Sequence, residues 1–147
     1  MIHGFLKACT VSPALRVADC AFNTQQTIAA MQRAALDGAQ LAVFPELGLT
    51  GYTCGDLFLS ALLLDAAEEA LLNICAHTQN CDPVVVLGVP LRAGGKLYNC
   101  AAVLHRGRIL GVVPKTHLPN YGEFYELRQF SSAKTLDGKV YTITLCG

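Results

Sequence analysis

Residues 41–46 read Leu-Ala-Val-Phe-Pro-Glu, a short unbroken apolar run that ends at a proline and a carboxylate. A run of this length predicts a strand buried on both faces. A second such run, Pro83–Val89, follows a stretch with helical spacing of apolar residues, Leu57–Thr78. Buried strands that alternate with helices indicate an α/β layered fold.

The flanking segments extend this pattern to the order β-α-β-α-β-β-β. Arg106-Gly107-Arg108 separates two apolar runs and predicts a hairpin turn. Asn23, with Gln26 three residues later, resembles a capping box that opens the first helix, and Gly38 closes it. We find no internal repeat or interdomain linker. The other strands of this order are Gly4–Ser12, Leu97–His105 and Ile109–Val113, and a further, last strand is expected at Val140–Leu145.

Composition limits the classes of function. The 147 residues carry eleven basic and eleven acidic side chains with no run of either sign, which disfavours nucleic acid and anionic membrane as partners. Seven scattered cysteines without a C-x-x-C pair fit a reducing cytosol better than disulfides or a metal site. The most apolar segment, residues 57–72, contains three carboxylates, so it does not predict a membrane span. We therefore expect a cytoplasmic protein.

Glu46 is the first candidate for chemistry. It lies just beyond the carboxyl end of a buried strand, where α/β folds usually place their sites, and a carboxylate there can act as a general base. The alternative interpretation is a strand-end glutamate that caps the following loop.

Lys115 is the second candidate, and it too follows an apolar strand. A lysine ammonium is a compact donor that can stabilise a developing oxyanion. Taken by itself, a lysine in this position is more often an exposed, solubilising side chain.

Taken together, segments 44–52 (Phe-Pro-Glu-Leu-Gly-Leu-Thr-Gly-Tyr) and 114–126 resemble the first two signature regions of the nitrilase, or carbon–nitrogen hydrolase, superfamily. The resemblance implies an α-β-β-α sandwich, of which this chain is the N-terminal part, and a Glu-Lys-Cys triad. Glu46 and Lys115 match its first two members. Glu123 matches a second glutamate that the family often has close to the lysine. The order of the motifs then predicts that Glu46 and Lys115 lie together at the ends of neighbouring strands.

The loops around both motifs more closely resemble the glutaminase domain of glutamine-dependent NAD synthetases, on residues 51–58, 118–121 and 124–126. That resemblance implies release of ammonia from L-glutamine. A separate synthetase domain would use the ammonia, with ATP and Mg²⁺, to amidate deamido-NAD. It also implies that Tyr52, Tyr121, Phe124 and Glu126 shape the glutamine pocket, with Tyr52 and Tyr121 lining one hollow. No metal or cofactor is expected in this chain.

The nucleophile departs from the family pattern, in which the cysteine ends a strand and an acidic residue follows it. Cys146 ends a strand-like run, but Gly147 follows. We therefore expect the nucleophile to lie beyond this chain. Residues 1–147 would then form a hydrolase domain that is incomplete at its C-terminus, and the synthetase domain would be absent. We expect the chain alone to be inactive. The alternatives are a stand-alone amidase or nitrilase, and a non-catalytic binding module.

Assembly is the last expectation from the sequence. Hydrophobic residues make up 52% of the chain. A sandwich cut short would leave a sheet edge and an apolar face uncovered, and both features favour association. We therefore expect a homo-oligomer.

Overall fold

The computed structural model describes residues 4–136, 138 and 140–146. Its centre is a five-stranded sheet in the order β1-β2-β3-β4-β5. The three N-terminal strands run parallel, and β3, β4 and β5 are joined as antiparallel neighbours. The strands are β1 (Ala8–Thr10), β2 (Leu41–Val43), β3 (Val84–Ala93), β4 (Lys96–His105) and β5 (Arg108–Pro114). The α/β class and the order β-α-β-α-β-β-β are confirmed.

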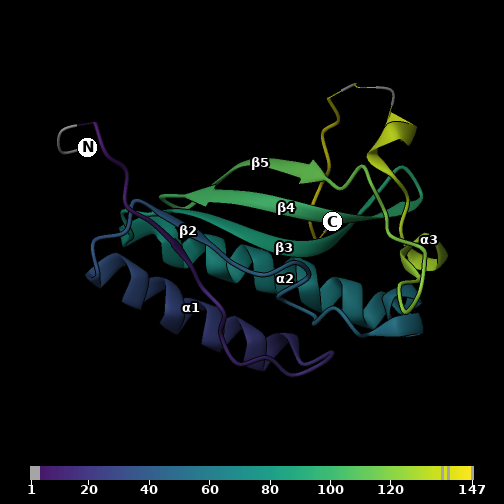
Figure 1. Ribbon diagram of the computed structural model, residues 1–147, viewed down its shortest axis with the longest axis horizontal. Helices are drawn as coiled ribbons and strands as arrows, with labels where there is room; N and C mark the ends of the chain where they lie inside the picture. The colour runs from purple at the N-terminus through teal and green to yellow at the C-terminus, as the bar shows by residue number, and fades with distance from the viewer. Residues whose placement is uncertain (1–3, 137, 139, 147) are drawn as a thin grey trace.

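Two long helices, α1 (Cys20–Leu36) and α2 (Ala61–His77), cover one face of this sheet, below it in Figure 1. The capping box predicted at Asn23 is wrong. Asp19 caps α1 by accepting the backbone N–H of Phe22 at 2.9 Å. Asn23 is fully buried inside the helix, where its amide binds the backbone of Arg16 and Leu49. Its side chain therefore anchors the preceding loop and does not start the helix.

The remaining helical segments are short. Before α2, residues 55–59 form the 3-10 helix η1 (Gly55–Leu59), so α2 begins four residues later than predicted. The other short helices are η2 (Thr78–Asn80), α3 (Glu126–Gln129) and η3 (Ala133–Leu136).

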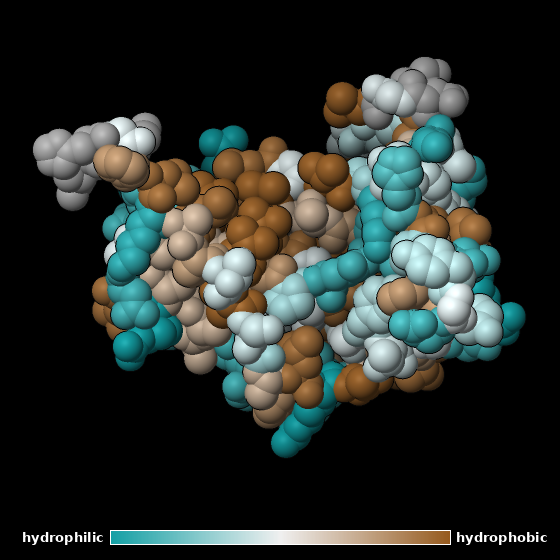
Figure 2. Space-filling model, in the orientation of Figure 1, coloured by the Kyte–Doolittle hydropathy of each residue, from teal (hydrophilic) through white to brown (hydrophobic). Residues whose placement is uncertain are grey.

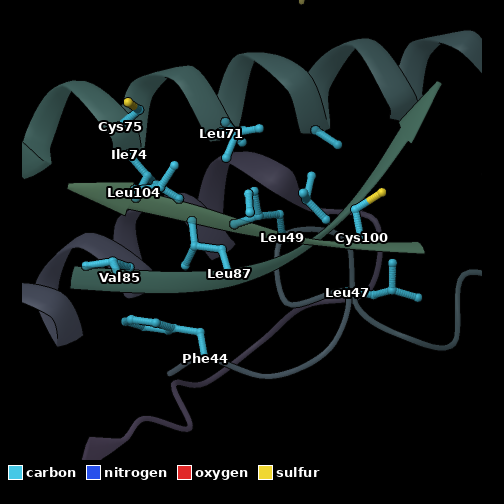
Figure 3. Close-up of a cluster of buried hydrophobic side chains, with 14 of the residues drawn as sticks. Phe44, Leu47, Leu49, Leu71, Ile74, Cys75, Val85, Leu87, Cys100 and Leu104 are labelled. Atoms are coloured by element: carbon cyan, nitrogen blue, oxygen red, sulfur yellow. The ribbon is translucent and has the colours of Figure 1, made fainter. Parts of the chain in front are cut away.

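The core lies between α2 and the covered face of the sheet (Figure 3). Odd-numbered residues of β3 point into it, and Val85, Leu87 and Val89 are at most 1% exposed. Leu71 and Ile74 of α2 meet them from the helix side and are fully buried. Burying one such side chain contributes about 1.5–3 kcal/mol, so this layer holds the helices on the sheet.

In the described residues, no helix covers the opposite face of the sheet. Val86 and Val103 form a cross-strand pair on this face and are only half-buried, and Val113 is 62% exposed. Figure 2 shows apolar side chains gathered over the sheet. We call this surface the open face.

The strand expected at Val140–Leu145 is wrong, because the structure has no strand in residues 140–146. The alternating apolar pattern is present, but a strand forms only where another strand's edge supplies hydrogen bonds. This segment makes other contacts. The Tyr141 hydroxyl donates to the carbonyl of Leu136, and the Cys146 N–H donates to Glu68 of α2 at 3.0 Å.

None of the helices in residues 4–136, 138 and 140–146 combines the length and the apolar character that a membrane crossing requires.

Candidate active site

Glu46 lies in a tight turn that continues from β2 across the open face. The N–H of Phe44 still donates to Val86 of β3, and Leu47 then adopts a left-handed backbone with φ of 49°. Gly88 of β3 lies directly beneath this turn. A Cβ on Gly88 would lie 2.3 Å from the backbone nitrogen of Leu47 and 2.5 Å from the carbonyl oxygen of Pro45. The turn can approach the sheet this closely only because residue 88 has no side chain.

Lys115 follows β5, and its ammonium reaches Glu46, with 2.6 Å between Nζ and Oε1. The predicted proximity of the two charges is confirmed. The prediction that they follow neighbouring strands is wrong, because β3 and β4 lie between β2 and β5. The loops after β2 and β5 reach over β3 and β4 and meet on the open face.

Glu126, at the start of α3, occupies the place expected for Glu123. Its Oε1 lies 2.8 Å from Lys115 Nζ, and its side chain is 4% exposed. Its second oxygen, Oε2, is buried and has no hydrogen-bond partner among the described residues. Glu123 is exposed, and no ion pair to it occurs among the described residues. Glu126 and not Glu123 faces Lys115 because of the turn into α3. In this turn the N–H of Glu126 donates to the carbonyl of Pro119, and the Glu126 carboxylate points inward.

Tyr52 extends the cluster by donating its hydroxyl to Glu126 Oε1 at 2.6 Å. Burial, this hydrogen bond and the charges of Glu126, Glu46 and Glu123 raise the pKa of Tyr52 well above its ordinary value of 10.0. The hydroxyl therefore keeps its proton and remains a donor near neutral pH.

The aromatic residues predicted for the glutamine pocket form a connected row. Phe124 packs edge-on against both Tyr52 and Tyr121, with ring centroids 6.3 and 5.7 Å apart. Tyr52, Glu123 and Glu126 line a hollow of about 230 Å³. Tyr121 is 72% exposed and lines a different hollow, beside His117 and Pro119. The prediction that Tyr52 and Tyr121 line the same hollow is therefore wrong, and Phe124 links them instead.

Lys115 remains a cation in this setting. Desolvation works against its ammonium form, but hydrogen bonds and charges from Glu126 and Glu46 outweigh desolvation and raise the pKa of Lys115. The cluster therefore presents a fixed positive charge beside the Glu46 carboxylate. Opposite charges held this close, in a site partly shielded from water, interact far more strongly than in bulk water.

Asn99 of β4 also belongs to this cluster, although neither sequence motif indicated it. Its Nδ2 donates to Glu46 Oε1 at 2.5 Å, and its side chain is buried among the groups of the cluster. The available signal was its place as an amide side chain within the apolar strand 97–105, because a polar group inside such a strand needs a partner.

Cys146 lies apart from this cluster. The charged groups that act on it are Glu68, Glu69 and Asp65 of α2 and Arg92 of β3. Local desolvation and the three carboxylates raise the pKa of its thiol, which opposes formation of the reactive thiolate. In the described part of the chain, no group of three or more His, Cys, Asp or Glu side chains is arranged to hold a metal ion.

The chain belongs to the carbon-nitrogen hydrolase family, whose family model matches residues 7–144. Among curated relatives, it is similar to the glutamine-dependent NAD(+) synthetase of Mycobacterium tuberculosis, with 43% identity over 145 residues. That alignment covers 99% of this chain and 21% of the relative. The enzyme of the same name from Mycobacterium leprae is 38% identical over 94% of this chain and 20% of its own length. The chain thus spans about a fifth of the length of the relatives it matches.

Solved structures show the same relationship. The glutamine-dependent NAD(+) synthetase of Cytophaga hutchinsonii superposes with a TM-score of 0.81 at 31% identity, over 86% of this chain and 22% of that one. The corresponding enzyme of Acinetobacter baumannii gives a TM-score of 0.76 at 32% identity, over 87% and 24%. An amidase of the nitrilase superfamily from Nesterenkonia shares the fold, with a TM-score of 0.75 at 20% identity, over 87% and 48%.

Proposed function

We propose that the cluster around Glu46 and Lys115 cleaves the side-chain amide of L-glutamine and supplies ammonia for the ATP-dependent amidation of deamido-NAD to NAD. The observation that carries the proposal is the 2.6 Å contact between the Glu46 carboxylate and the Lys115 ammonium group on the open face. The similarity to NAD synthetases over 99% of the chain supports this choice of substrate.

The roles of the residues follow from the chemistry of an amide. A carboxamide is a poor electrophile, so a cysteine thiol attacks its carbonyl carbon while Glu46 takes the thiol proton. Lys115 stabilises the oxygen as it becomes negative, an interaction worth about 3–4 kcal/mol. Glu46 then returns the proton to the departing ammonia. Water cleaves the thioester, again with Glu46 as base, and releases glutamate and the thiol. We place the nucleophile outside this chain, in keeping with the setting of Cys146.

The pocket proposal rests on the aromatic row and on Glu126. A substrate with a positive amino group would find an acceptor in the buried, unpartnered Oε2 of Glu126. Tyr52 and Phe124 would flank that group, with Tyr121 at the exposed end of the row. Glu123, which lines the hollow beside Tyr52, would act at the mouth of the pocket without contacting Lys115.

The organisation of the whole protein belongs to the same proposal. We assign the ATP-using step to a synthetase domain of a longer protein and expect this chain alone to release no ammonia from glutamine. No observation favours a stand-alone amidase, because the fold shared with an amidase at 20% identity is common to the family. Assembly into a homo-oligomer stays a prediction.

The test compares two nitrogen sources in a full-length protein that carries this chain. Glu46→Ala and Lys115→Ala should each nearly abolish NAD synthesis from glutamine and leave synthesis from added ammonia intact. Glu69→Ala, on α2 and outside the cluster, is the matched control and should change neither. Glutamine-driven synthesis that survives Glu46→Ala would overturn the proposal.

A further inference from the structure

We propose that Asn99 is a positioning residue of this site, which holds the Glu46 carboxylate and the Lys115 backbone in one fixed arrangement. The inference rests on the proposed function, because it names the group that orients the base of that reaction. Asn99 belongs to neither of the two motifs that identify the family, and its role comes from the contacts alone.

Asn99 contacts both loops of the site. Its side-chain Nδ2 donates to Glu46 Oε1 at 2.5 Å, and its backbone carbonyl accepts the N–H of Lys115 at 2.8 Å. It lies on β4, between β3 and β5, and opposite Pro90 of β3. A single strand residue therefore joins the loop after β2 to the loop after β5, which have no strand contact with each other.

Burial makes this contact costly to lose. The Asn99 side chain is 3% exposed, so removing its partner would leave an amide without a hydrogen bond and without water. Hydrogen bonds to a charged acceptor are shorter and stronger than neutral ones. Gly88 also contributes to this contact. Because it has no side chain, the turn that carries Glu46 can lie close enough to the sheet for Glu46 to reach Asn99.

The pattern of donors fixes which oxygen of Glu46 is free to react. Asn99 Nδ2 and Lys115 Nζ both donate to Oε1, and the described residues place no hydrogen-bond donor on Oε2. The carboxylate is thus held at one oxygen and open at the other, as a base that must take and return a proton requires. Without Asn99, Lys115 alone would hold Glu46, and the carboxylate could rotate. A displacement of about 1 Å in a catalytic group can reduce the rate about 100-fold.

Two variants separate the amide donor from the space it fills. Asn99→Asp keeps the shape, removes the donor and adds a negative charge beside Glu46, whereas Asn99→Leu replaces the amide with an uncharged apolar group of similar size. In the full-length protein, each should lower kcat for glutamine about 100-fold with KM within about twofold. Ammonia-driven synthesis should not change. Asn80→Asp, at an exposed position, is the control. If either folded variant keeps kcat within about threefold of the parent protein, Asn99 has no positioning role. If Asn99→Leu does not fold, the kcat of Asn99→Asp alone decides whether Asn99 positions Glu46.

A second measurement separates this inference from the proposed function. In the chain itself, the ¹⁵N resonance of the Asn99 side-chain amide should move when Glu46 is changed to Gln, and it should stay in place for Glu69→Gln. If the full-length protein has no glutaminase activity but the resonance moves, the proposed function fails and the contact stands. If the resonance does not move in Glu46→Gln, Asn99 does not hold Glu46.

Discussion

Val85, Leu87 and Val89 of β3 point towards α2 and are almost completely buried, whereas Val86 and Gly88 of the same strand point to the open face. On β4, Leu104 lies on the covered face, and Asn99 lies on the open face beneath Glu46. The covered face contains apolar groups, and the open face combines half-buried and exposed valines with a glycine, an amide and three charged side chains.

The difference follows from the twofold repeat of a strand, in which successive side chains point to opposite faces. One set of residues can be chosen for packing while the residues between them are chosen for chemistry. A substitution on the covered face should therefore act on stability, and a substitution on the open face should act on the geometry of the site.

The largest expected effect is on the covered face. Leu104 is fully buried in β4, so Leu104→Ala leaves a cavity beneath α2 and should reduce the free energy of unfolding by about 2–5 kcal/mol. Val113→Ala on the open face, where the side chain is 62% exposed, should change it by less than about 1 kcal/mol. Urea unfolding followed by circular dichroism measures both. Equal losses for the two variants would mean that the faces do not differ as described.

Gly88→Ala should have the second-largest effect on the free energy of unfolding, because its new methyl group would clash with backbone atoms that cannot easily move. Overpacking of this kind costs about 1–3 kcal/mol and would also lift Glu46 away from Lys115. Gly111→Ala in β5 is the control, since a Cβ there meets nothing within 4 Å. A Gly88→Ala protein as stable as the Gly111→Ala protein would show that the turn does not lie against β3.

Tyr52→Phe should reduce the free energy of unfolding by less, about 1 kcal/mol, because it removes one hydrogen bond and the Tyr52 side chain is only partly buried. The pKa of Tyr52 is raised in the folded state, so the folded protein keeps this proton after the unfolded chain has lost it. Its contribution to stability should be complete below pH about 10 and should fall as the pH rises further. Tyr52→Phe should flatten that decline, and Tyr125→Phe, at an exposed position, should not.

The smallest effect is expected at the ion pair between Asp56 of η1 and Arg128 of α3, with contacts of 2.7 and 2.8 Å. A hydrogen bond from Arg128 holds the pKa of Asp56 below its usual range, so the stabilisation should be lost as pH falls through that lowered value. Asp56→Asn should lower the melting temperature slightly at pH 7 in low salt. The difference should vanish in 1 M salt, because exposed pairs are screened. A loss that persists in high salt would indicate a packing role.

The sequence predicted the covered face better than the open face, for a physical reason. The runs at 41–44 and 83–89 predicted strands, which form, although they are not buried on both faces because Val43 and Val86 are only half-buried. The hairpin turn forms at Arg106 and Gly107, both with positive φ. Such features depend on neighbours along the chain. Asn99, by contrast, meets Glu46 across 53 positions, and Glu126 replaced Glu123 beside Lys115 because of a turn that the intervening loop makes. The pattern at 140–145 predicted a strand, but in the structure this segment pairs with none of the described strands.

The position of bound glutamine shows whether Glu46 and Lys115 act on the substrate. In a crystal structure of a full-length protein that carries this chain, with its nucleophilic cysteine changed to alanine, glutamine should lie on the open face. We expect its amide oxygen within hydrogen-bond distance of Lys115 Nζ and its amide nitrogen beside Glu46. If glutamine binds elsewhere and leaves Glu46 and Lys115 facing solvent, the two residues do not form the active site.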